Sequence, residues 1–276
     1  MSTVSASKAG LVKQWDALLR EAWGLFAKCQ STPYLVTPSI PILYFGDYPR
    51  YCLSSPKVIT VGLNPSLAEF PTAKPFQRFP AAEHICTVKP SPEDLKKYST
   101  ALNNYFEVHP FAKWFGSFEP LLNGLGCSYY NDKGQPNRAL HTDLCSPLAT
   151  RPTWSKLKES ERESLVRTGK PLWHKLVECL SPHIILISVR QSYRDEHIEL
   201  AFKGNWQPFH TVTKKKDGNS RKEPYVVETR DIEIRDKPAL LVFGQAANTP
   251  LGTISGEEKR NVGRKLKEVL YAHNHR

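Results

Sequence analysis

Asp143 is a carboxylate in the middle of an apolar segment. The segment "LHTDLCSPL" (140–148) is otherwise typical of a buried strand, and Pro147 closes it. Burying a carboxylate is costly unless the group is paired, hydrogen-bonded or neutralised. This position therefore predicts a carboxyl group with a specific partner, which is either a ligand or another part of the protein.

Asn64 follows a second apolar segment, "PKVITVGLN" (56–64). Gly62 permits close approach of a ligand to the backbone, and Pro65 stiffens the turn that holds the Asn64 side chain. An asparagine there could orient a water molecule or a substrate hydroxyl. The alternative is an ordinary Asx-type turn. The segment lacks the G-K-[ST] of a P-loop, so phosphate cradling is not expected.

The elements that would position these residues alternate between strand and helix. Buried strands are predicted at 56–64, 140–148, 183–189 and 238–244. Helices are predicted at 10–29, 92–106, 110–125, 155–180 with a break at 169–171, 190 to about 203, and 255–274. This alternation predicts an α/β protein with a parallel sheet covered on both faces. Ligands of such sheets bind beyond the carboxyl ends of the strands, where Asn64 and Asp143 lie.

Two further segments complete the predicted organisation. Residues 209–235 are expected to form a β-hairpin insertion with the charged tip "KKKDGNSRKE", and residues 1–9 are expected to be disordered. A single domain is expected over residues 10–276.

The amino-acid composition indicates which class of molecule the protein binds. The chain has 276 residues and a formal net charge of +11, which favours a polyanion such as nucleic acid. The six cysteines have neither C-x-x-C pairs nor zinc-finger spacing, so reduced thiols, no metal and a cytoplasmic location are expected. No signal peptide or membrane span is predicted.

Four strand-end motifs resemble those of the uracil-DNA glycosylase superfamily. "GLNPS" (62–66) resembles the G-M-N-P-G and G-I-N-P-G forms of the single-strand-selective and mismatch-specific branches. "HTDLCSPL" (141–148) resembles the H-N-L-C-P-L strand of the single-strand-selective branch, and the segment from 183 to 202 resembles a strand and helix of that branch. "NTPLG" (248–252) resembles the final H-P-S-P loop.

This resemblance, which covers roughly residues 35–270, implies a three-layer α/β/α fold with a central four-stranded parallel sheet. It also implies base excision from DNA by a monomeric enzyme without cofactor or metal, after the target nucleotide is flipped out. Asn64 matches the residue that positions the attacking water, and Phe76 matches the aromatic that stacks on the base, unless Phe76 only packs in the core. The amides near Gly62 and Leu63 would contact the base edge.

Two positions depart from the family pattern. The histidine that stabilises the leaving base is absent, since Ala247 takes its place and Gln245 is the nearest polar residue. The family asparagine that reads uracil is replaced by Asp143. An amide matches the N3 donor and O4 acceptor of uracil. A carboxyl group can accept from the amino group of cytosine and, when protonated, donate to its N3; burial favours the protonated form of carboxyl groups.

These departures point to a 5-substituted cytosine as the substrate. Ser66 stands where the classical uracil enzyme has a tyrosine that excludes groups on C5, so the pocket is expected to be open there. An enzyme that removed plain cytosine would damage its own genome. Phage DNA with 5-hydroxymethylcytosine or its glucosylated form offers a target without that conflict, which makes antiviral defence the expected role.

Contacts with DNA are assigned to two segments. Leu251 matches a wedge residue that enters the base stack, and Asn248 and Thr249 belong to the same loop. Lys214, Lys215 and Lys216 form the basic hairpin tip, for which a merely solvated loop is the alternative. Two other functions stay open: a repair enzyme for uracil or 5-hydroxymethyluracil, and an inactive nucleic-acid-binding protein.

Overall fold

The computed structural model describes residues 2–85, 89–198, 202, 204–215 and 217–274. The chain divides into two compact units. Unit 1 contains Met1–Gly46, Gly62–His109 and Thr142–Ser181, and unit 2 contains Asp47–Val61, Pro110–His141 and Pro182–Arg276. The prediction of a single domain over residues 10–276 is neither confirmed nor excluded by this division.

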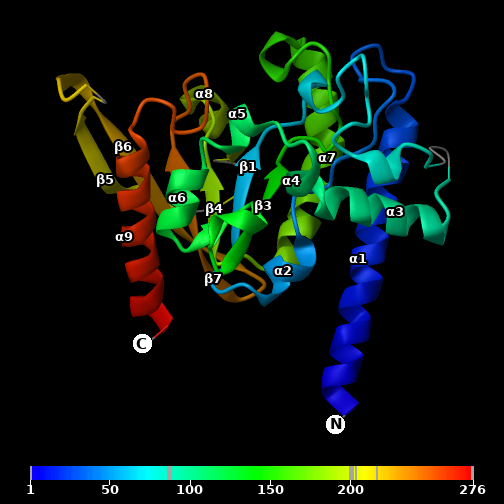
Figure 1. The fold of residues 1–276 in the computed structure, drawn as a ribbon, viewed down its shortest axis with the longest axis horizontal. Helices are drawn as coiled ribbons and strands as arrows, with labels where there is room; N and C mark the ends of the chain where they lie inside the picture. The colour runs from blue at the N-terminus through cyan, green and yellow to red at the C-terminus, as the bar shows by residue number, and fades with distance from the viewer. Residues whose placement is uncertain (1, 86–88, 199–201, 203, 216, 275–276) are drawn as a thin grey trace. The chain divides into compact units, whose positions relative to one another are not determined.

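Unit 2 contains the sheet, which is coloured from cyan through green to orange in Figure 1. Its strands lie in the order β2-β3-β1-β4-β7-β6-β5. Their bounds are β1 Val58–Gly62, β2 Cys127–Ser128, β3 Asn137–Asp143, β4 Ile184–Ile187, β5 Gln207–Lys214, β6 Ser220–Ile234 and β7 Lys237–Gly244. β1 pairs with β4, and β4 with β7, in parallel, whereas β6 pairs antiparallel with both β5 and β7.

The α/β class is thus confirmed, whereas the expected four-stranded central sheet is not confirmed. The described part of the chain forms seven strands in one sheet. The predicted hairpin is present as β5 and β6, yet it extends the sheet instead of standing apart from it, because β6 pairs with β7 along its length from Val227 to Ile234. β1, β4 and β7 are almost wholly buried, which agrees with their apolar sequences.

The helices of unit 2 include a long closing helix. Their bounds are α2 Tyr48–Leu53, α5 Ala112–Phe115, α6 Glu119–Gly124, α8 Gln191–Tyr193 and α9 Gly256–Asn274, with short turns η3 Asn131–Lys133 and η5 Arg194–Ile198. α6 packs closely on α9, and a Cβ atom at Gly124 would lie 2.9 Å from the Cα atom of Gly263. Glycine at both positions therefore lets the two backbones approach.

Unit 1 is built on the contact between α1 and α7. Its helices are α1 Ser2–Cys29, α3 Pro92–Asn103, α4 Tyr105–Val108 and α7 Glu159–Leu180, with turns η1 Leu67–Glu69, η2 Pro80–Ala82 and η4 Trp154–Lys156. None of the helices in the described residues is long and apolar enough to cross a bilayer.

Three helical expectations need correction. The helix expected at 110–125 is divided into α5 and α6. α1 begins at Ser2, so it includes residues 2–9 that were expected to be disordered; extending an existing helix by a few residues costs far less than starting one. α7 runs without the break expected at 169–171, and Pro171 lies inside it. Gly169 is needed there because a Cβ atom would lie 2.2 Å from the carbonyl oxygen of Cys145.

Candidate active site

The turn after β1 is hydrogen-bonded to the loop after β3, and both lie in unit 1. The amide of Leu144 donates to the carbonyl oxygen of Gly62 at 3.0 Å. The amide of Cys145 donates to the carbonyl of Leu63 at 2.8 Å, and the Ser146 amide reaches the same oxygen at 3.3 Å. The two strand ends that carry Asn64 and Asp143 are therefore fixed side by side, as the sequence predicts. Leu63 is half-buried.

Asn64 is held in one orientation by three acceptors. Its Nδ2 atom donates to the carbonyl of Pro65 at 2.8 Å, to Thr150 Oγ1 at 2.9 Å and to the carbonyl of Leu148 at 3.3 Å. The carbonyl oxygens of Pro65 and Leu148 can only accept hydrogen bonds, and the Thr150 hydroxyl can accept one as well. The carboxamide atom that faces them is therefore the nitrogen. The Oδ1 atom makes no hydrogen bond within the described residues, so it can accept one from a water molecule or a substrate hydroxyl.

Ser66 and Phe76 flank this turn in different ways. Ser66 caps η1, since its Oγ atom accepts from the Ala68 amide at 3.2 Å. Its side chain thus has a structural partner, and the open space expected at C5 stays a prediction. Phe76 is only half-buried, and its ring meets that of Phe70 edge-on with 6.3 Å between centroids. A partly exposed face suits stacking on a base better than a fully buried core ring does.

Asp143 is the last residue of β3 and is 7 % exposed. The preceding residue is anchored from α7, because Trp173 Nε1 donates to Thr142 Oγ1 at 3.0 Å. The buried environment that the sequence predicts for Asp143 is therefore present. Its role as the residue that reads the base stays a prediction.

Glu69 is a second buried carboxyl group near Asp143, and sequence reasoning missed it. It is 5 % exposed, and its Oε2 atom accepts a hydrogen bond from Tyr105 Oη at 2.6 Å. Burial raises the pKa of Glu69 to about 7, and the Asp143 charge adds to this rise, while Tyr105 and Arg78 oppose it. The signal was available, because "SLAEF" places a carboxylate in an apolar stretch just as "HTDLC" does.

The residues predicted around the final loop lie in unit 2. Gln245 and Asn248 are exposed and Thr249 is half-buried. Leu251, however, is 3 % exposed with a φ of 49°, and its Cδ2 atom lies 2.1 Å from where a Cβ of Gly244 would be. A wedge needs an accessible side chain, so this role would require Leu251 to leave its present packing.

The buried end of this loop is tied down by two side chains. The Leu251 amide donates to Ser188 Oγ at 2.8 Å. Lys259 is 5 % exposed, and its Nζ atom donates to the carbonyls of Ser117 and Pro250 at 2.8 and 3.0 Å. Such a buried ammonium group is stabilised by its acceptors and fixes the loop to α9.

The basic tip of the β5–β6 hairpin lies next to the same loop. Lys214 and Lys215 are exposed, and Lys216 lies outside the described residues. Arg221 donates from Nε to the Lys214 carbonyl at 3.0 Å and from Nη2 to the carbonyl of Thr253. The two segments assigned to DNA contact therefore belong to one surface of unit 2.

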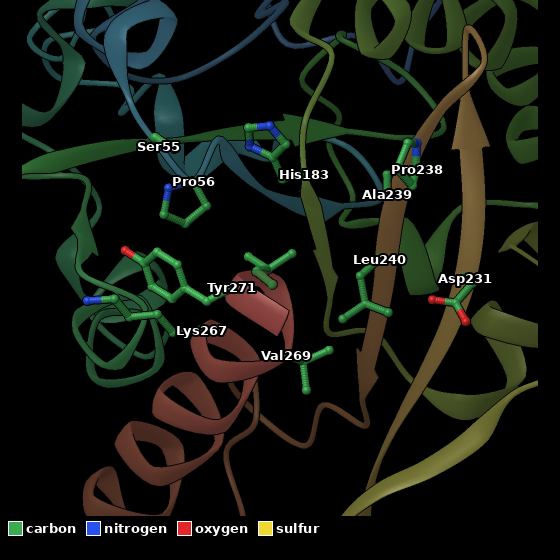
Figure 2. Close-up of a pocket in the computed structure, with 11 residues that line it drawn as sticks. Ser55, Pro56, His183, Asp231, Pro238, Ala239, Leu240, Lys267, Val269 and Tyr271 are labelled. Carbon is green, nitrogen blue, oxygen red and sulfur yellow. The ribbon is translucent and has the colours of Figure 1, made fainter. Parts of the chain in front are cut away.

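A separate pocket of about 90 Å³ lies at the other end of the parallel strands (Figure 2). Pro56 precedes β1, His183 precedes β4 and Pro238 lies at the start of β7, while Lys267 and Tyr271 come from α9. His183 Nδ1 accepts from the Lys57 amide at 2.8 Å, and burial and the nearby lysine charges lower the pKa of His183. None of the predicted site residues lines this pocket.

No protein-family model matches the chain, and no curated protein matches it. We therefore infer the function from the residues and their geometry, together with the resemblance of the strand-end motifs.

Proposed function

We propose that this protein is a monofunctional DNA glycosylase that excises a 5-substituted cytosine and leaves an abasic site. The observation that carries the proposal is the fixed Asn64 carboxamide beside the loop that begins at Asp143. The amide nitrogen is saturated by protein acceptors, so the oxygen is left to orient the attacking water. A water-positioning residue requires this arrangement, in which the protein holds the amide nitrogen and the amide oxygen can bind water.

The proposed reaction uses the residues of unit 1 in distinct roles. Phe76 stacks on the flipped base, and Asp143 reads its hydrogen-bonding edge. Asn64 Oδ1 accepts a hydrogen bond from water and directs the water oxygen at the sugar carbon. Positive charge develops on the sugar as the base leaves, and a buried carboxylate nearby stabilises that charge. No metal or cofactor enters this scheme.

We further propose that the protein has the three-layer α/β/α arrangement of the uracil-DNA glycosylase superfamily. It would act on DNA as a cytoplasmic monomer. The exposed Lys214 and Lys215 would contact phosphates. The biological target would be phage DNA that carries 5-hydroxymethylcytosine or its glucosylated form.

The test is base release from defined oligonucleotides. Single- and double-stranded DNA with cytosine, 5-hydroxymethylcytosine, glucosylated 5-hydroxymethylcytosine, uracil or 5-hydroxymethyluracil is incubated with the protein and then cleaved with alkali. The proposal predicts cleavage only at the 5-substituted cytosines. Cleavage at the uracil bases would favour a repair enzyme, and binding without cleavage of any substrate would favour an inactive nucleic-acid-binding protein.

A further inference from the structure

The closing helix α9 carries a row of cationic side chains on one face. Arg260, Arg264 and Lys267 follow one another at intervals of four and three residues, and Tyr271 continues the row one turn later. Arg260, Arg264 and Tyr271 are exposed, and Lys267 is half-buried. Lys267 and Tyr271 extend from the same side of α9 (Figure 2). At a rise of about 1.5 Å per residue, the three cations cover about 10 Å of the helix axis.

This row lines a groove in the surface of unit 2, where α6 and α9 lie side by side (Figure 1). The groove consists of two hollows of about 480 and about 490 Å³, and both are lined by Asn123 of α6 and by Arg260. The buried Gly124, which lets α6 approach α9, also lines it. We call it the α6–α9 groove. One hollow is lined by Tyr130, Asp132 and Lys133, and the other by Arg264, Lys267 and Tyr271.

The acidic residues that line the α6–α9 groove do not cancel its positive charge. Glu119 is directed into the protein, because its Oε1 atom accepts from the Tyr129 amide at 2.9 Å and its Oε2 atom accepts from neighbouring side chains. The Asp132 carboxylate lies 3.8 Å from Lys133 Nζ, so these two charges compensate each other. Among the described lining residues this leaves Glu268 as the carboxylate that opposes the three cations of α9.

The α6–α9 groove adjoins the final loop, which the sequence assigns to DNA contact. Gly116 lines the groove, and the neighbouring Ser117 donates from Oγ to the Pro250 carbonyl. Lys259 Nζ donates to the Ser117 carbonyl at 2.8 Å and fixes this junction to α9. A strand that contacts the final loop can therefore continue along α9.

Aromatic rings lie in both hollows of the groove. Tyr271 is 52 % exposed and Tyr130 is half-buried. The Nζ atom of Lys267 lies 5.9 Å from the centre of the Tyr271 ring, and that of Lys133 lies 5.9 Å from the centre of the Tyr130 ring. A basic groove with aromatic rings is typical of single-strand binding, in which the cations follow the phosphates and the bases stack on the rings. At about 3.4 Å per nucleotide of a stacked strand, the row of cations spans about three nucleotides.

We infer that the α6–α9 groove binds a single-stranded segment of DNA that continues from the final loop. Its phosphates contact Arg260, Arg264 and Lys267, and one of its bases stacks on Tyr271. A duplex fits this arrangement less well, because its bases stack on each other and offer no face to Tyr271. The inference rests on the DNA binding of the proposed function and adds a contact surface to it.

The experiment compares two neighbouring cations of α9. Binding of a labelled short oligothymidine is measured by fluorescence anisotropy over a series of salt concentrations. Arg264→Glu reverses a charge in the groove. Lys265→Glu is the matched control, because Lys265 is equally exposed but faces β5, with its Nζ atom 3.0 Å from His210 Nδ1.

Arg264→Glu should weaken binding by about tenfold or more and lower the slope of log affinity against log salt by about 0.7, the share of one phosphate contact on a single strand. Lys265→Glu should leave the slope as it is. Glu268→Gln should tighten binding, because it removes the charge that opposes the phosphates. This gain in affinity would not arise from damage to the fold.

Tyr271 tests the stacking separately from the charge. Tyr271→Ala should weaken binding of oligothymidine by a factor of about five to a hundred and leave the salt slope unchanged. Tyr271→Phe keeps the ring and should bind like the wild type. The same pair is measured on a duplex, where Tyr271→Ala should have little effect.

Each contrary result rejects a different part of the inference. Equal loss of binding in Arg264→Glu and Lys265→Glu would reject the groove as the binding surface. Displacement of oligothymidine by an oligoglutamate of equal charge at equal concentration would assign the groove to acidic peptides. Equal effects of Tyr271→Ala on single-stranded and duplex DNA would overturn the choice of a single strand.

Base release by the same variants separates this inference from the proposed function. Base release by the wild type, with an oligothymidine affinity that Arg264→Glu does not change, would reject the groove and keep the glycosylase. Loss of oligothymidine binding in Arg264→Glu, with no base release from any substrate by the wild type, would keep the groove and reject the glycosylase.

Discussion

Asn64 Nδ2 and Thr150 Oγ1 lie 2.9 Å apart, so a side-chain hydrogen bond joins the turn after β1 to the loop after β3. Thr150 is fully buried. The backbone is joined here as well, since the Thr150 amide donates to the Pro65 carbonyl at 3.2 Å. The orientation of the Asn64 carboxamide is therefore set by the packing of unit 1 before any ligand arrives.

Asn64→Ala should lower base release by a factor of about a hundred to ten thousand, because the attacking water loses its acceptor. Binding should change little, since Asn64 contacts water rather than DNA in this scheme. Single-turnover release and fluorescence anisotropy with the same oligonucleotide measure the two properties.

A graded variant separates water positioning from folding. Thr150→Val removes one of the three acceptors of Asn64 and keeps the shape of the side chain. A lost hydrogen bond of this kind is worth about 1 kcal/mol, so release should fall by a factor of about five. Thr168→Val, which removes an exposed hydroxyl on α7 that bonds to the Ser164 carbonyl, is the control and should leave release unchanged. Wild-type turnover in Asn64→Ala would refute the assignment.

Lys214→Ala combined with Lys215→Ala should weaken DNA binding and flatten its dependence on salt. Each phosphate contact contributes nearly one unit to the slope of log affinity against log salt, so the slope should fall by about two. Lys96→Ala with Lys97→Ala removes the same charge from the exposed face of α3 and should leave the slope as it is. A slope unchanged by the hairpin variant would assign the tip to solvent.

Leu251→Ala should destabilise the folded protein by about 2–5 kcal/mol, because it empties a packed site above Gly244. Denaturant unfolding measures this loss. Leu53→Ala is the control in the same unit, since Leu53 is 87 % exposed and should cost almost nothing. Equal stability of the two variants would mean that Leu251 is not packed in solution and is available as a wedge.

Glu69 should make folding stability depend on pH. Its pKa is about 7 in the folded protein against 4.5 for an unburied glutamate, so the folded state binds the proton more tightly. The stabilisation is complete below the lower value and is lost as pH rises through the higher one. The free energy of unfolding of the wild type should therefore fall by up to about 3 kcal/mol more than that of Glu69→Gln between about pH 4 and about pH 8.

Chemical denaturation across that pH range, with Glu83→Gln as a second reference, measures the difference. Parallel curves for the wild type and Glu69→Gln would show that burial does not raise the pKa of Glu69.

β1, β4 and β7 could be predicted from the sequence because their residues are almost wholly buried and read as apolar runs. β2 was missed because it has only two residues, and β3 ends at Asp143, before most of the apolar segment 140–148. The place of β5 and β6 could not, since Arg230 and its neighbours on β6 alternate in burial and give no sign of which strand they will join. The continuity of α7 was missed because its sequence contains Pro171, whereas the contact of Gly169 with Cys145 belongs to tertiary packing.

The sequence predicts site residues where a polar side chain lies at the end of a buried strand. Asn64 and Asp143 follow that rule, and their loops are joined as expected. Glu69 was not found, because its burial and its hydrogen bond with Tyr105 come from the folding of η1 and α4 rather than from any strand end. Leu251 was assigned from a motif, and a motif does not reveal whether a side chain packs inward.

The most direct test of the account is the base preference of Asp143→Asn. The shape of the side chain is almost unchanged, so folding should survive, but an amide matches the N3 donor and O4 acceptor of uracil and has no acidic proton to give to N3 of cytosine. An unsatisfied polar group costs about 1–3 kcal/mol, a factor of roughly five to over a hundred. Single-turnover release is measured from paired duplexes with 5-hydroxymethylcytosine or 5-hydroxymethyluracil. The account predicts that the wild type prefers the cytosine base and that Asp143→Asn shifts the preference toward the uracil base; a wild type that prefers the uracil base, or a variant that keeps the wild-type preference, would contradict it.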